Sequence, residues 1–301
     1  MQTVRKRDFR SRRILESWIE RTLLVATWIS AVAIFSILLL LVYFCLPLFT
    51  SGGFGEVFSW QWRPFAGRYG ILPMCAGSFC ISVLALVIAF PAAIGICFLA
   101  DSLAPAKIAR FLMALIHFMT GIPTVIYGFV SVFLLVPRVR DWLKAGTGFT
   151  LLTAALTLAL LILPTIALIF HARLERIDRN LRLASEAMGL TAIQQVRHVL
   201  LPAASNGLVM AATLGFGRAI GDTLISLMLA GNTPQFPDSL LTSIRTLTAH
   251  IALVLATDSQ SMAYQSVFTA GLILFLLMGV INLFIRRLGK IGREGTDEKH
   301  L

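Results

Sequence analysis

The chain has 301 residues, of which 57% are hydrophobic and only 14% are charged. A soluble protein of this length needs more polar surface than this composition supplies, so we expect a membrane protein. The formal net charge of +11 is spread between apolar stretches, without the soluble, aromatic-rich basic face of a nucleic-acid-binding module, and nucleic acid is not an expected partner.

Six apolar segments are long enough to cross a bilayer, which takes about 20 helical residues. The first follows a basic N-terminal stretch and is too long for the apolar core of a signal peptide, so we expect it to be retained. A further apolar stretch, 244–256, is shorter and is predicted to be an interfacial or re-entrant helix. The predicted spans are 23–49, 70–100, 111–137, 149–170, 202–230 and 266–285.

These segments predict an all-α membrane protein with three parts. Residues 1–69 are expected to hold a basic cytoplasmic N-terminus, the first transmembrane helix and the first periplasmic loop. Residues 70–286 would form a five-helix core, and 287–301 a cytoplasmic tail. Within the core, Pro123 follows Gly121 by two residues in the third span and predicts a kink there.

The basic residues predict the orientation of the chain. Of its 26 lysines and arginines, 19 fall in the segments that lie inside if the N-terminus is inside, and six fall in the outer loops. Cytoplasmic loops carry such an excess, so both termini are expected in the cytoplasm. The four cysteines lie in or beside apolar stretches without metal-ligand spacing and are interpreted as small hydrophobic residues.

One basic residue, Arg218, lies near the middle of the fifth predicted span, and Asp222 follows four residues later. On one continuous helix the two side chains would share a face. A charge at this depth costs several kcal/mol unless it is paired or hydrated. Two interpretations follow. Arg218 either binds an oxyanion in a water-accessible path, with phosphate the best match to a guanidinium, or forms an internal ion pair with Asp222 that fixes helix packing.

Three features nearby extend this hypothesis. Gly217 and Gly221 form a small-xxx-small pair, which suggests close packing of the fifth helix on a partner helix across a pore. Arg245, in the outer loop, is a candidate entry contact for an anion, against the simpler interpretation of a solvated charge. Tyr127 and Thr124, beside Pro123, are candidate path residues, although a packing role is favoured.

In the polar connector before the fifth span, Gly189 is followed after nine residues by Val199-Leu-Leu-Pro202, and Ala184-Ser185 stands a few residues before this glycine. This spacing resembles the cytoplasmic "EAA" loop of ABC importer permeases, which has two alanines at the positions of Ala184 and Ser185. Leu183 replaces the motif's glutamate. The resemblance implies a short coupling helix that docks on a cytoplasmic ATPase; the alternative is an ordinary amphipathic loop. The implied coupling residues are Leu183, Ala184, Ser185, Glu186, Gly189, Val199, Leu201 and Pro202.

Three further stretches, 69–74, 121–128 and 217–223, resemble the phosphate ABC importer permease family, and its PstC-type subunit in particular. The stretch 245–253 agrees with that subunit. Asp222 stands where the family has glutamate, and Val254 where an acidic residue is expected. The resemblance implies the type I permease fold with six transmembrane helices, and a substrate path that includes Arg218, Asp222, Thr223 and Arg245.

The chain contains no G-x-x-x-x-G-K-[ST] motif and no catalytic constellation, so ATP hydrolysis is assigned to a separate subunit and no cofactor or metal is expected. The resemblance implies a bacterial inner-membrane importer of inorganic phosphate. Its partners would be a second, PstA-like permease, two ATPase subunits and a periplasmic phosphate-binding protein. A permease for sulfate, molybdate or a phosphonate, and a phosphate-sensing or assembly subunit without flux, are the alternatives.

Overall fold

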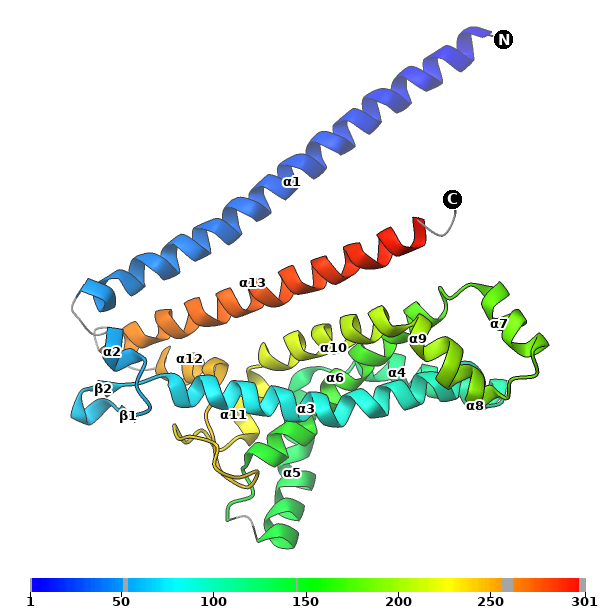
Figure 1. The fold of residues 1–301 in the computed structure, drawn as a ribbon. Coiled ribbons are helices and arrows are strands. Elements are labelled where there is room, and N and C mark those ends of the chain that lie inside the picture. Colours follow the sequence, from blue (N-terminus) through cyan, green and yellow to red (C-terminus); the bar gives the residue numbers. More distant parts are fainter. Residues whose placement is uncertain (1, 51–53, 145, 256–261, 298–301) are drawn as a thin grey trace.

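The computed structural model describes residues 2–50, 54–144, 146–255 and 262–297, and long helices dominate it (Figure 1). The Gln2 end of α1, the Asp297 end of α13 and helix α7 (Arg179–Ala187) lie at one end of the molecule. A short hairpin and α12 (Leu247–Leu255) lie at the other end. The long helices are α1 (Gln2–Thr50), α3 (Leu72–Phe98), α6 (Leu151–Leu174), α10 (Ser205–Ile220) and α13 (Met262–Asp297).

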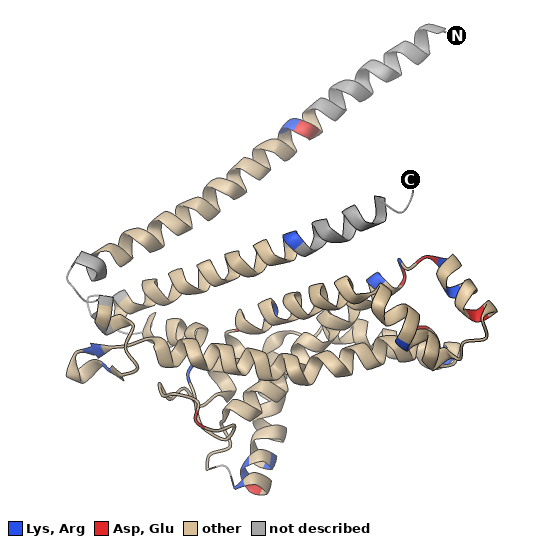
Figure 2. Cartoon of the chain, viewed as in Figure 1, with Lys and Arg blue, Asp and Glu red and all other residues tan. Residues whose placement is uncertain are grey.

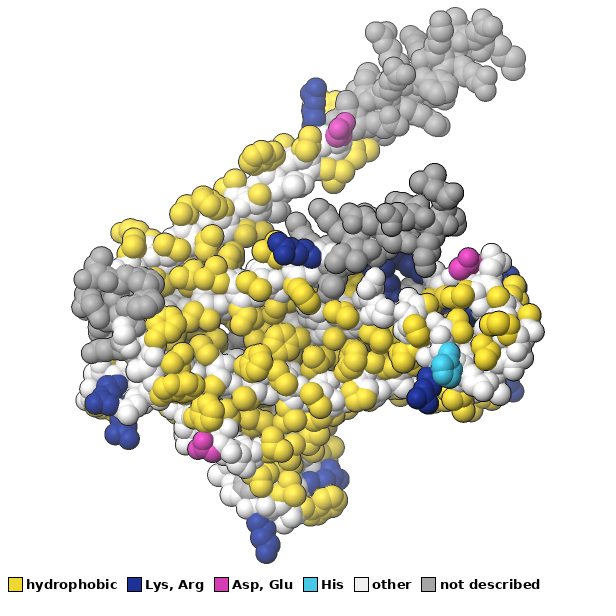
Figure 3. Space-filling model, viewed as in Figure 1, with side chains coloured by type: hydrophobic (Ala, Val, Ile, Leu, Met, Phe, Trp, Pro, Cys, Tyr) yellow, Lys and Arg dark blue, Asp and Glu magenta, His cyan; other side chains and the backbone are white. Residues whose placement is uncertain are grey.

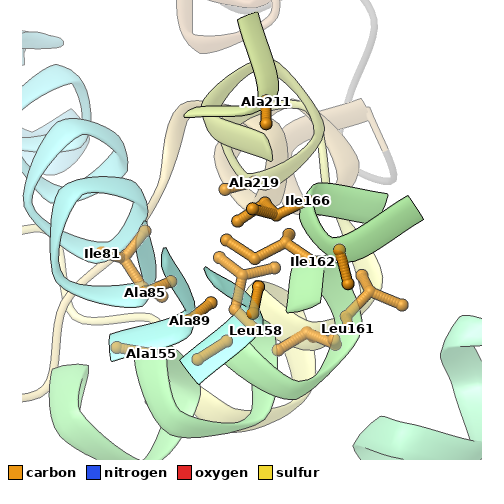
Figure 4. Packing of buried hydrophobic residues seen from close by; sticks show 14 of the residues in the cluster. Ile81, Ala85, Ala89, Ala155, Leu158, Leu161, Ile162, Ile166, Ala211 and Ala219 are labelled. Atoms are coloured by element: carbon orange, nitrogen blue, oxygen red, sulfur yellow. The ribbon is translucent and has the colours of Figure 1, made fainter. Parts of the chain in front are cut away.

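The core is formed where α3, α6 and α10 pack together, and small side chains make this close contact possible (Figure 4). On α3 a buried stripe repeats every fourth residue, from Ile81 through Ala85 and Ala89. The large side chains of α6, such as Leu158 and Ile162, fill the space that these alanines leave. Because these residues hold three helices at a fixed spacing, the core provides the frame on which the polar site is built.

Helix α10 contributes a matching stripe of small residues at intervals of four. Gly207, Ala211, Gly215 and Ala219 are all buried. A Cβ added at Gly215 would lie 2.6 Å from Cγ1 of Ile166 on α6, which shows how closely the two helices approach. Helix α10 is therefore fixed against α6 and α3 along this stripe, and it also packs against α13.

The helical membrane architecture expected from the sequence is confirmed. Among the described residues, four helices are long and apolar enough to cross a membrane, and two bent helix pairs bring the number to six if each pair is one span. The sixth predicted span coincides with the apolar stretch Ser266–Ile285 of α13. The short helix predicted at 244–256 is observed as α12, Leu247–Leu255, and it is not a spanning candidate.

The third predicted span is broken rather than gently kinked. Helices α4 (Ala106–Thr120) and α5 (Thr124–Leu143) meet at an angle of 100°. Pro123 has no N–H to continue the helix, and its ring excludes the carbonyl one turn earlier. The hydroxyl of Tyr127 donates to the carbonyl oxygen of Met119 at 2.9 Å, which satisfies one acceptor left at the end of α4.

The prediction of one continuous helix over 202–230 is wrong. A bend of 72° separates the segment Ala192–Ala203, which includes α8 (Ala192–Gln195) and α9 (Leu201–Ala203), from α10. Helix α10 then ends at Ile220, and a turn at 221–223 leads into α11 (Leu224–Leu229). Oδ1 of Asp222 accepts from the backbone N–H of Ile225 at 2.9 Å. This local bond starts a new helix and competes with continuation of the old one.

The all-helical expectation missed one small sheet. Strands β1 (Trp62–Arg63) and β2 (Arg68–Tyr69) pair in antiparallel register around a 3-10 turn, η1 (Pro64–Ala66). Gly67 closes this turn in the left-handed conformation, with φ of 68°. The short helix α2 (Phe54–Val57) precedes the hairpin, which leads directly into α3.

Charge and hydrophobicity are separated along the molecule. Among the described residues, lysine, arginine, aspartate and glutamate gather near α7, near the end of α5 and at the hairpin (Figure 2). Hydrophobic side chains cover the long helices between these regions almost continuously on the face seen in Figure 3. This distribution is that of a protein with lipid around its middle and water at both ends.

Candidate substrate path and coupling segment

Arg218 lies in the last turn of α10 and is exposed on the surface of this chain. Arg218 follows Ala211 by seven residues and Gly215 by three, so it continues the buried side of α10, but in the last turn its side chain is exposed. A cation in the last turn of a helix interacts favourably with the helix dipole. The fold thus presents an exposed guanidinium at the end of a helix that the core holds in place.

The predicted geometry of Arg218 and Asp222 is wrong, because the two residues do not share one helix. The three ion pairs found among the described residues do not include Arg218. Asp222 instead starts α11, and its carbonyl oxygen accepts from the hydroxyl of Thr248 at 3.0 Å. Thr223 lies in the same turn. Asp222 therefore shapes the break beside Arg218, and the guanidinium forms no ion pair with a carboxylate of the described residues.

Two groups remain within electrostatic reach of Arg218. The positive charge of Arg218 acts on the carboxylate of Asp222 and also on the hydroxyl of Tyr127. Tyr127 lies in the first turns of α5, after Pro123. The break between α4 and α5 and the break between α10 and α11 are therefore both near Arg218. Broken helices at membrane depth occur where the backbone is buried in protein or lines a water-filled cavity.

Arg245 is half-buried and fixed two residues before α12, at the end of the molecule that carries the hairpin. Its Nε donates to the carbonyl oxygen of Asn232 at 2.8 Å, and burial lowers the pKa of its guanidinium. Gly77 on α3 makes room for this segment, since a Cβ there would lie 2.5 Å from the carbonyl oxygen of Arg245. The alternative considered from the sequence was a solvated charge, and a solvated side chain would not be held in one orientation. The fixed orientation of Arg245 suits a residue that contacts a passing anion.

The glycine pair Gly217 and Gly221 faces α13 of the same chain rather than a partner across a pore. Added Cβ atoms would lie 3.4 Å from Cγ2 of Ile281 and 2.9 Å from Cε of Met278, respectively. Gly221 lies just after the last residue of α10. Gly207 and Gly215, on the same helix, also make close contacts: added Cβ atoms would lie 2.8 Å from Cβ of Arg173 and 2.6 Å from Cγ1 of Ile166, both on α6.

The predicted coupling segment forms α7, α8, a π-helical turn η3 (Val196–Leu200) and α9. Gly189 has a φ of 72°, and a Cβ there would meet nothing within 4 Å of its own chain. The N–H groups of Gly189 and Leu190 donate to the carbonyl oxygens of Glu186 and Ser185. These two bonds form a Schellman cap, so the glycine is required for its conformation and ends α7 at a fixed place.

The coupling segment exposes large apolar side chains away from the spanning helices. Met188 is 72% exposed and Ile193 is 69% exposed, and Leu183, in place of the motif's glutamate, is also exposed. Ala184 and Glu186 are also exposed, whereas Ser185 is buried. At the far end of the motif, Val199 and Leu201 are partly buried and Pro202 is exposed. Exposed apolar side chains at the polar end of the molecule indicate an interface with another protein.

One interaction of the coupling segment was not predicted from the sequence. Nη1 of Arg182 donates to Oδ2 of Asp101 at 2.8 Å, and its Nη2 donates to Oδ1 of Asp101 at 3.2 Å. Asp101 lies in the π-helical turn η2 (Leu99–Leu103) at the end of α3. In the sequence, the one feature that could have indicated this pair was an acidic residue at the end of an apolar span. Its partner Arg182 lies 81 positions later, directly before the motif.

The described residues include no group of three histidine, cysteine or acidic side chains placed to hold a metal ion. A cavity of about 430 Å³ lies between α3 and the 237–240 loop, but its lining is mostly apolar and does not include Arg218. The arrangement thus combines an exposed arginine at a helix break, a fixed arginine at the end of the molecule with the hairpin and an exposed apolar segment at the opposite end.

Comparison with known proteins identifies the family. The family described as binding-protein-dependent transport system inner membrane component matches residues 93–290. The chain is 35% identical to the probable ABC transporter permease protein YqgH of Bacillus subtilis, covering 76% of this chain and 75% of that protein. It is 28% identical to the phosphate transport system permease protein PstC of Pasteurella multocida, covering 82% of this chain and 83% of that protein.

Solved structures share the fold. The MetNI methionine ABC transporter in an inward-facing conformation matches with a TM-score of 0.59 and 23% identity, over 77% of this chain and 99% of that chain. An ABC transporter that imports the acidic polysaccharide alginate matches with a TM-score of 0.56 and 14% identity, over 83% and 91%. The chain therefore belongs to the binding-protein-dependent transport system inner membrane component family and is a membrane permease subunit of an ABC importer, not an enzyme.

Proposed function

We propose that this chain is the PstC-type permease of an importer that carries inorganic phosphate into the cytoplasm of a bacterial cell. The observation that carries the proposal is Arg218, an exposed guanidinium in the last turn of α10 that forms no ion pair with the described residues. A planar, permanently charged fork matches phosphate oxygens better than an ammonium does. The similarity to PstC proteins over most of the chain supports the same substrate.

The exposure of Arg218 fits a path between two permease subunits. A second, PstA-like permease facing α10 would enclose the arginine, and water in the path would hydrate its charge. Asp222 does not neutralise the guanidinium, so the anion itself supplies the counter-charge. Arg245 would meet the anion first, at the outer end, after its release from a periplasmic phosphate-binding protein.

Energy would enter at the opposite end of the molecule. Two cytoplasmic ATPase subunits would drive the cycle, and one of them would receive the exposed apolar side chains Met188 and Ile193. The Gln2 and Asp297 ends of the terminal helices lie at the same end of the molecule as α7 (Figure 1). We therefore place both termini in the cytoplasm, as the excess of basic residues predicts.

The decisive measurement is uptake of radiolabelled phosphate by cells with and without this chain, with sulfate and molybdate as competitors. We expect uptake to require the chain and to resist both competitors. Arg218→Lys keeps the charge but loses the fork, so uptake should fall about tenfold or more at unchanged protein level. Arg110→Lys, an exposed arginine that donates to the carbonyl oxygen of Ala106, is the matched control and should transport normally.

Two results would contradict the proposal. Undiminished uptake by the Arg218→Lys variant would remove the arginine from the path. Phosphate uptake abolished by sulfate or molybdate would assign the permease to another oxyanion. Membrane insertion of every variant is checked by its amount in purified membranes.

A further inference from the structure

Asp101 and Arg182 form the only long-range ion pair among the described residues. The other two, Arg140 with Asp141 and His171 with Glu175, join residues within four positions of each other. Asp101 and Arg182 are 81 positions apart and belong to different elements, the end of α3 and the coupling helix α7. This pair therefore ties the coupling segment to a spanning helix.

The geometry of the pair fixes both distance and orientation. Both carboxylate oxygens of Asp101 accept from the guanidinium of Arg182, and Nη2 also donates to the carbonyl oxygen of Leu174 at 3.0 Å. The side chains are 10% and 25% exposed, so salt screens their interaction less than it screens a surface pair. Ser102 donates to the same carboxylate at 2.7 Å and holds it in place. A bidentate pair of this kind resists rotation as well as separation.

A second set of hydrogen bonds binds α7 to the rest of the coupling segment. Nε2 of Gln195, at the end of α8, donates to Oγ of Ser185 at 2.7 Å and to the carbonyl oxygen of Arg182 at 3.3 Å. The hydroxyl of the buried Ser185 donates back to that carbonyl at 2.7 Å. Helix α8 also contacts η2, the turn that carries Asp101. These hydrogen bonds join α7 and α8 into one unit, and Arg182 connects this unit to the end of α3.

Motion of α3 would reach the candidate substrate path directly. Helix α3 packs on α6 and α10 through its alanine stripe, and Cδ1 of Leu86 lies 3.6 Å from where a Cβ of Gly215 would be. Closely packed helices move as rigid bodies because their interfaces do not deform continuously. A displacement of α7 is thereby passed through Asp101 to α3, and from α3 to α10, the helix of Arg218.

We propose that Asp101 is a positioning residue for transport, which passes the movement of the ATPase-docked coupling helix to α3 through its ion pair with Arg182. The proposal rests on the proposed function, because it assumes that ATP hydrolysis drives uptake through this segment. If the ion pair only stabilised the fold, its loss would lower the amount of folded complex. ATP hydrolysis and phosphate uptake would then fall together.

The test uses the complete transporter, with its partner permease, ATPases and binding protein, in proteoliposomes with ATP inside. Radiolabelled phosphate entry and ATP hydrolysis are measured in the same vesicles. For Asp101→Asn we expect the phosphate carried per ATP hydrolysed to fall at least fivefold, with hydrolysis retained. Asp101→Glu keeps the charge and should recover at least half of the normal ratio. Asp141→Asn removes one partner of the exposed pair with Arg140 and serves as the matched control, with a normal ratio.

Each outcome bears on one claim. A normal ratio in Asp101→Asn, or a parallel loss of hydrolysis and uptake with an unchanged ratio, would overturn the positioning role. Failure of Asp101→Glu to recover more than Asp101→Asn would show that the carboxylate is not what matters, and would overturn it too. Absence of phosphate uptake by the unaltered transporter, with uptake of sulfate or molybdate instead, would overturn the proposed substrate; the ratio would then be measured with the transported anion.

Discussion

Substitutions of Gly189 can separate the effect of backbone conformation from the effect of contact with a partner protein. Its φ of 72° places it in the left-handed region, and its own chain leaves the space around it open. An alanine there costs about 1–2 kcal/mol of backbone strain and meets no atom of this chain. That strain lowers the equilibrium constant for forming the capped end of α7 by about 5- to 30-fold. Asparagine tolerates the left-handed conformation and should cost much less.

Three variants at this position are compared by phosphate uptake and by the amount of ATPase that co-purifies with the chain. We expect Gly189→Asn to be near normal, Gly189→Ala to be clearly reduced and Gly189→Trp to be lowest. The tryptophan side chain would clash only with a docked partner, because its own chain leaves this space open. Overpacking of that interface costs about 1–3 kcal/mol more. Equal activity of the alanine and asparagine variants would refute the conformational argument. Equal activity of the alanine and tryptophan variants would show that nothing docks at this surface.

Three further predictions follow from single positions. A cysteine at Asp238, in a background free of native cysteines, should react with an impermeant maleimide in intact cells, and one at Gln194 should not; the reverse pattern would invert the topology. Gly215→Ala, whose Cβ would lie 2.6 Å from a side chain of α6, should cost about 1–3 kcal/mol in thermal unfolding, whereas Gly95→Ala, with nothing within 4 Å, should be neutral or stabilising. Burial lowers the pKa of His250 from 6.5 to about 3. The unfolded chain therefore binds a proton below pH 6.5 that the folded chain does not, and stability should fall by about 1.4 kcal/mol per pH unit as the pH drops. His250→Asn should flatten this dependence, measured as the thermal unfolding midpoint between pH 7 and pH 5.

The membrane architecture was predictable because it depends on local composition. A helix in lipid satisfies its own backbone, so the length and apolarity of a segment decide whether it crosses, and Ser266–Ile285 was located to the residue. The short helix α12 and the interruption at Pro123, predicted as a kink, follow from equally local rules. The loop that contains Gly189 was found because its spacing resembles a known motif.

Tertiary structure decided what the polar residues do. The spacing of Arg218 and Asp222 implied one shared helix face, but α10 ends at Ile220, and the carbonyl oxygen of Asp222 accepts from the hydroxyl of Thr248, 26 positions away. The partners of Asp101 and of Gly215 lie on other helices, and no pattern along the chain indicates them. Local periodicity determines which segments are helical and which are apolar. Which charge finds a partner, and which small residue allows a close helix contact, depends on contacts that exist only after the helices have packed.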